Sequence, residues 1–74
     1  SDLQISEQNV MEVQSSEPMV KVELRKESTK ELLQTITLNE VFATKVDLNA
    51  YQTENILIVF YGKNGISSEF TWGH

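Results

Sequence analysis

The sequence predicts a small all-β protein, folded as an antiparallel β-sandwich. Three observations predict this fold class. Apolar and polar residues alternate over several short segments, most regularly over residues 19–26. Turn-forming residues separate these segments, as at Pro18 and at the Asn64-Gly65 pair. The chain has 74 residues and no cysteine, so we expect one domain, residues 1–74, without a disulfide to stabilise it.

The N-terminal part of the chain predicts a hairpin followed by a loop. Residues 3–13 form the hairpin, and its turn lies at residues 6–9. The apolar residues that alternate along its two strands are Leu3, Ile5, Met11 and Val13. Residues 14–18 then form a loop, because Pro18 has no N–H and a central strand cannot pass through it.

Residues 19–26 predict a half-buried antiparallel strand. One face carries Val20, Val22 and Leu24, and the other face carries Lys21, Glu23 and Arg25. Four basic residues are close together here, namely Lys21, Arg25, Lys26 and Lys30. We interpret them as a solvated strand face and turn rather than as a binding patch.

Residues 28–38 admit two interpretations. Ser28 and Glu31 have the spacing of a helix capping box, which favours a helix. The β-branched run 35–37 favours a strand, and the apolar spacing of a helix breaks at Asn39. We therefore expect a strand at residues 32–38, with the helix as the alternative.

The next segments predict a loop, a strand and a turn. The loop spans residues 39–44, and its Val41 and Phe42 are expected to fold back onto the core. Residues 46–50 alternate as a strand with Val46, Leu48 and Ala50 on one face. Residues 52–55 turn the chain.

The C-terminal segments predict a central strand and a hairpin. Residues 56–61 are apolar on both faces, so this strand is either central in the sheet or covered on its second side. The Asn64-Gly65 pair after it is typical of a tight hairpin. Ile66, Ser68, Phe70 and Trp72 then alternate, either as a final strand or as an extended tail.

Net charge and hydropathy limit the classes of partner that we expect for this chain. The net charge of −5 argues against nucleic acid, because phosphate binding needs clustered lysine and arginine. No apolar run approaches the roughly 20 residues of a membrane span, and no signal peptide is recognisable. We therefore expect a cytoplasmic or nuclear protein without a membrane partner. The chain opens on Ser1-Asp2 without methionine, which indicates a piece of a longer protein.

The sequence predicts binding rather than catalysis. The only histidine, His74, is the last residue, so no nucleophile has an evident base beside it. The three glycines lie late in the chain and form no phosphate-binding loop. The carboxylates are spread along the sequence without the spacing of a metal site. We expect no enzymatic activity, no cofactor and no metal.

The strand pattern of residues 33–60 resembles the latter half of a CS or α-crystallin (HSP20-like) domain. That superfamily includes the small heat-shock proteins and the CS-type co-chaperones of Hsp90. In its pattern one strand ends in Leu, as at Leu38. A second strand reads apolar-x-apolar-x-Ala, as in Val46-Asp-Leu-Asn-Ala50, and an apolar strand follows, as in Ile56-Leu-Ile-Val59.

Within the superfamily, residues 2–61 look most like the C-terminal CS domain of the PIH family. Those proteins are adaptors of the R2TP complex, which joins Hsp90 to the RuvB-like ATPases and serves snoRNP assembly. The resemblance implies a non-enzymatic adaptor domain that binds a TPR co-chaperone through strand-edge or groove contacts. The chain departs from the family pattern at Asn39 and Asn55, where Pro and Gly are usual, and it begins after the family's first strands.

A sandwich without its first strands exposes an unpaired edge, which is a template for a strand of a partner. The apolar residues expected to contact this partner are Leu3, Ile5, Met11, Val13, Leu57, Val59 and Tyr61. For each of them, a place in the ordinary core is the alternative. Two other functions stay open. One is a small heat-shock-like holdase fragment, and the other is an unrelated ubiquitin-like or immunoglobulin-like interaction module, which a helix at residues 28–42 would indicate.

Overall fold

A computed structural model of the chain describes residues 2–7 and 9–73, with side chains from residue 9 onward. The fold is all-β, as the alternation predicts. Its elements are β1 (Asp2–Glu7), β2 (Val10–Lys26), β3 (Leu32–Asp47), the 3₁₀ turn η1 (Asn49–Tyr51), β4 (Ile56–Gly62) and β5 (Gly65–Trp72). The hairpin predicted at residues 3–13 is confirmed as the antiparallel pair β1–β2.

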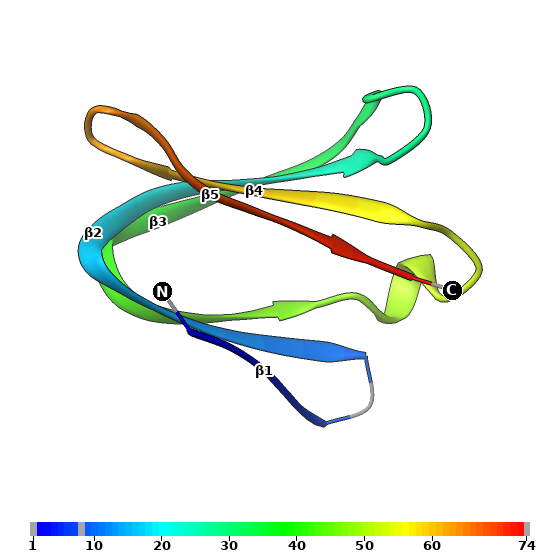
Figure 1. Cartoon of the computed structure of the whole chain (residues 1–74), viewed down its shortest axis with the longest axis horizontal. Helices are drawn as coiled ribbons and strands as arrows, with labels where there is room; N and C mark the ends of the chain where they lie inside the picture. Colours follow the sequence, from blue (N-terminus) through cyan, green and yellow to red (C-terminus); the bar gives the residue numbers. More distant parts are fainter. Residues whose placement is uncertain (1, 8, 74) are drawn as a thin grey trace.

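The strands form one five-stranded antiparallel sheet that folds over on itself into two layers (Figure 1). The order is β1-β2-β4-β5, and β3 pairs with β2. Both β2 and β3 are long and bend sharply at the same end of the molecule. One layer contains β1 with residues 10–14 and 43–47, and the other contains residues 32–41 and 19–26 with β4 and β5. The result is a small sandwich whose layers share two strands.

The bend lies where the sequence predicts loops, and the two predictions of loops at residues 14–18 and 39–44 are wrong. The β2–β3 register passes from Gln14 opposite Ala43 to Met19 opposite Val41, so the ladder is interrupted between them. Pro18 lies in that interruption, where a missing N–H costs no ladder hydrogen bond. Extended backbone therefore continues through a proline because the strand bulges there.

The core lies between the two layers. Its fully buried residues are Met11, Val13, Met19, Val22, Leu24, Val46, Leu48, Ile56, Ile58 and Phe60. The face predicted for residues 19–26 is correct at Val22 and Leu24 but wrong at Val20, which is only half-buried. The register shifts between Met19 and Lys21, and this bulge turns Met19 into the core in place of Val20.

The elements within residues 28–51 are partly as predicted, but their boundaries differ. The strand at residues 32–38 is confirmed and the helical alternative is wrong, because β3 begins at Leu32 after a turn. The strand predicted at residues 46–50 ends early at Asp47. The Asp47 carboxylate accepts hydrogen bonds from the backbone N–H of Asn49 at 2.9 Å and from its side-chain amide at 2.7 Å, which starts η1 instead.

Apolar residues around the bend divide between core and surface. Val41 packs against the core, as predicted. Phe42 does not fold back, since 56% of it is exposed. Leu48 is buried as the alternation predicts, whereas Ala50 lies exposed in η1. The turn at residues 52–55 is confirmed.

β4 is a central strand, the first of the two alternatives that its apolar sequence leaves open, because it pairs with β2 on one side and β5 on the other. β5 is the final strand rather than an extended tail, and it packs Phe70 and Trp72 against the core. The rings of Phe60 and Phe70 meet edge-to-face, with centroids 5.8 Å apart. This contact joins β5 to the centre of the sandwich.

The β4–β5 hairpin turns at residues 63–64, with Gly62 opposite Gly65. Gly65 has φ of +116°, and a Cβ built on it would meet nothing within 4 Å. We expect Gly65→Ala to destabilise the fold by about 1 kcal/mol through backbone strain alone. Chemical denaturation measures the change. Gly62→Ala is the matched control: its Cβ would make an ordinary 3.5 Å contact with the Pro18 carbonyl oxygen, so we expect unchanged or slightly higher stability.

Candidate functional site: the outer face of β2 and β4

Three of the predicted contact residues lie on the face of the β2–β4 pair that points away from the core. The β2–β4 register places Leu57 opposite Arg25, Val59 opposite Glu23 and Tyr61 opposite Lys21. Successive residues of a strand alternate between faces, so these six share the side opposite Ile58 and Phe60. We call Lys21, Glu23, Arg25, Leu57, Val59 and Tyr61 the outer face.

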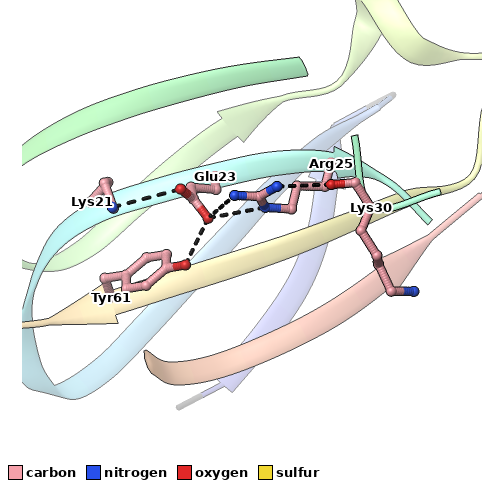
Figure 2. A network of polar contacts seen from close by, with 5 residues as sticks. All are labelled: Lys21, Glu23, Arg25, Lys30 and Tyr61. Atoms are coloured by element: carbon pink, nitrogen blue, oxygen red, sulfur yellow. Dashed lines mark hydrogen bonds and ion pairs between the residues drawn. The ribbon is translucent and has the colours of Figure 1, made fainter. Parts of the chain in front are cut away.

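Glu23 is the centre of a polar network on the outer face (Figure 2). Only 7% of this residue is exposed, which is unusual for a charged residue on an outward side. The Tyr61 hydroxyl donates a 2.7 Å hydrogen bond to Glu23 Oε1. Arg25 donates to the same oxygen from Nε at 3.2 Å, and its Nη2 lies 3.1 Å away. These partners satisfy the carboxylate that β2 and β4 shield from water.

The two basic residues of the outer face are held by further contacts. Arg25 Nη1 donates a 2.8 Å hydrogen bond to the backbone carbonyl of Lys30 in the β2–β3 turn. Lys21 Nζ lies 3.7 Å from Glu23 Oε2 and 4.2 Å from the centroid of the Tyr61 ring. The second distance is within the range of a cation–π contact. The network therefore fixes Arg25 and Lys21 against β4.

The network changes the acid–base properties of both of its acidic groups. The Tyr61 hydrogen bond holds the pKa of Glu23 below its ordinary value of 4.5, with a further contribution from Arg25, although burial opposes the shift. The same hydrogen bond to the Glu23 carboxylate raises the pKa of Tyr61. Glu23 is thus ionised and Tyr61 neutral at physiological pH, so the Tyr61 hydroxyl acts as a neutral donor to a charged acceptor.

The outer face is close to neutral on a chain of net charge −5. Two cations and one carboxylate lie within it, and Glu69 of β5 is opposite Val59 and adds a second carboxylate. Leu57 and Tyr61 are half-buried and reach the surface, whereas Val59 is only 4% exposed and offers almost no surface to a partner. This combination of apolar surface and fixed, paired charges suits contact with another protein.

The other predicted contact residues occupy different positions. Met11 and Val13 are each 1% exposed in the core, so they are not available to a partner in the folded chain. Leu3 and Ile5 have side chains outside the described part of the structure; their backbones pair with Val13 and Met11. The structure therefore brings Leu57, Val59 and Tyr61 together and separates them from the β1–β2 hairpin.

Sequence reasoning missed the roles of Glu23, Arg25 and Lys21, which it assigned to a solvated face. The sequence contains an alternating charged strand, residues 21–25, and an apolar strand that ends in Tyr61. Only the register shows that these two strands pair, so the sequence alone could not bring Glu23 and Tyr61 together. Because Glu23 lies opposite the apolar strand, its buried carboxylate needs charged partners, and Lys21 and Arg25 of its own strand supply them.

Within the described residues, no group of three or more His, Cys, Asp or Glu side chains is arranged to hold a metal ion. No helix in this same part of the chain has the length and apolar character to cross a membrane. A pocket of about 180 Å³ lies apart from the outer face, beside the β4–β5 hairpin and Pro18. Its volume is below the range typical of ligand pockets.

Comparison with known proteins finds no match to this chain among protein-family models, curated proteins or solved structures.

Proposed function

We propose that this chain is a protein-interaction domain that binds its partner through the outer face of β2 and β4. The observation that carries the proposal is the Glu23 network, which holds two cations and Tyr61 in place beside Leu57 and Val59. A rigid surface loses little side-chain freedom on binding. Tyrosine and arginine are also the residue types that dominate binding energy in protein interfaces.

The resemblance to CS domains supplies the class of partner. We propose that the chain is an adaptor of the PIH type, with a TPR co-chaperone of the Hsp90 system as its partner. The support for this finer proposal is the strand pattern of residues 33–60 and the nearly neutral character of the outer face. The mechanism is binding that brings other proteins together, and it requires no cofactor.

The proposal is tested by titrating the ¹⁵N-labelled chain with a TPR co-chaperone and following its amide signals. We expect the largest shifts in β4 and in residues 21–25. Leu57→Gln should weaken binding by about tenfold, because it places an amide where an apolar contact forms. Isothermal titration calorimetry measures the affinity of each variant.

Phe42→Gln is the control, since it also replaces an apolar residue with glutamine, at a position that is 56% exposed at the bend. We expect this variant to bind as the unchanged chain does. Equal losses in both variants would contradict a site on the outer face. If the amide signals do not shift on titration, a TPR co-chaperone is not the partner, and the description of the fold is unaffected.

A further inference from the structure

β3 is an edge of the sheet along its whole length. Within residues 2–7 and 9–73, its pairing is with β2 alone, first along residues 32–41 and then along residues 43–47. The side of β3 that faces away from β2 therefore presents backbone N–H and C=O groups to solvent. Such an edge is a template for another strand unless charges, prolines or bulges protect it.

The first half of β3 has little of this protection. Residues 32–39 read Leu-Leu-Gln-Thr-Ile-Thr-Leu-Asn, with no charge, no proline and no glycine. Uncharged segments of high β-propensity are those that pair most readily with copies of themselves. The opposite edge, β5, differs because it carries Glu69 and a register shift between its pairs with Phe60 and Tyr61. The β1 edge carries Asp2 and Glu7.

The ladder between β2 and β3 is regular over residues 34–37, which keeps the β3 edge straight there. Thr35 and Thr37 are exposed on the same side as the outer face, opposite Glu23 and Lys21 of β2. Ile36 and Leu38 point the other way and pack against the core. Gln34 shares the side of Ile36 and Leu38 but is exposed, so this side is apolar except at Gln34.

We infer that the β3 edge pairs with the β3 edge of a second copy of this chain, antiparallel and centred on Ile36. A two-fold axis perpendicular to the sheet keeps equal faces together, so Ile36 lies opposite Ile36 of the second copy. Thr35 then lies opposite Thr37 of the second copy, and this pair occurs twice. The contact is isologous and closes as a dimer.

The uncharged run of high β-propensity at residues 32–39 favours a second copy as the occupant, because such segments pair with copies of themselves. Two chains of net charge −5 repel one another, so a stable contact must keep their carboxylates apart. With Ile36 on the axis, residues 34–38 of each copy place no charged residue opposite another. Pairing through β5 would bring the Glu69 side chains of two copies close to the contact.

The test is sedimentation velocity of the whole chain over a concentration series, with two double variants. T35K/T37K places lysine opposite lysine twice across the contact. T35K/T37E is the matched control, because it places lysine opposite glutamate twice. It also sets the new lysine beside Glu23 and the new glutamate beside Lys21 within each copy. Both positions are exposed, so we expect both variants to fold, and thermal unfolding checks this.

We expect the unchanged chain to dimerise in a concentration-dependent manner. T35K/T37K should raise the dimer dissociation constant by roughly tenfold, and T35K/T37E should keep or lower it. Net charge alone cannot explain a higher dissociation constant for T35K/T37K, because this variant reduces the net negative charge of the chain and so weakens the repulsion between copies. A monomer at every concentration, or equal dissociation constants for both variants, would overturn the proposal. Neither result bears on partner binding by the outer face, which a separate titration measures.

Because the chain has no cysteine, introduced thiols test the register. A mixture of Thr35→Cys and Thr37→Cys chains should form the mixed disulfide in excess of either homodimer, since opposite residues lie within reach of a disulfide. Thr71→Cys on the β5 edge should show no such preference with either chain. Equal yields in all combinations would overturn pairing centred on Ile36.

Discussion

Phe60→Ala is expected to leave the chain largely unfolded. Phe60 is fully buried at the centre of β4, and its ring meets that of Phe70 edge-to-face. Truncating a buried phenylalanine typically costs about 3–5 kcal/mol, from lost burial and from the cavity that remains. A domain of this size has a total stability of about the same magnitude, so little remains after the substitution.

Far-ultraviolet circular dichroism with urea unfolding measures this loss. Phe42→Ala removes the same side chain from a position that is 56% exposed. We expect that control to change the free energy of unfolding by less than about 0.5 kcal/mol. Similar losses in the two variants would contradict the placement of the core between the layers.

Glu23→Ala is expected to cost about 2 kcal/mol at neutral pH. The substitution removes the shared acceptor of Tyr61 and Arg25 and an ion-pair partner of Lys21. Hydrogen bonds to a charged group contribute about 1.5–3 kcal/mol each when shielded, but the partial exposure of the cations reduces their share. Glu40→Ala is the control, because its 2.7 Å ion pair with Lys63 lies at the exposed surface and contributes little.

The cost of Glu23→Ala should depend on pH with a defined sign. The pKa of Glu23 in the folded chain lies below its ordinary value of 4.5, so the folded state binds the proton more weakly than the unfolded state. This stabilisation is complete above pH 4.5 and is lost as the pH falls through the lowered pKa. The pKa of Asp47 is also lowered, but Asp47 is present in both chains and cancels in the difference.

Urea unfolding of both chains between neutral and acidic pH measures this dependence. The difference in stability between them should shrink below pH 4.5. A difference that stays constant down to strongly acidic pH would show that packing, rather than the carboxylate's charge, accounts for the cost.

Local pattern was sufficient to predict the fold class, the β1–β2 hairpin and a strand at residues 56–61 with a central position as one of its two alternatives. These features depend on alternation and turn residues, which act within a few positions of the chain. The apolar character of residues 56–61 on both faces is one example, because it favours a strand with neighbours on both edges, and β4 pairs with β2 and β5.

Features set by the register between distant strands could not be predicted. Pro18 lies within β2 because β2 itself bulges there, and Met19 takes the core position expected for Val20 because of the register shift that follows. Alternation cannot reveal a bulge, since one extra residue reverses every side that follows. The Glu23–Tyr61 contact joins residues 38 positions apart and depends on the same register.

The shared strands of the sandwich determine how it responds to a bound partner. β2 and β3 each run through both layers, so neither layer has a boundary at which it could open while the other stays closed. We therefore expect the two layers to unfold together in one cooperative transition. A partner that binds only the folded outer face should therefore also protect Met11 and Val13 of the far layer against unfolding.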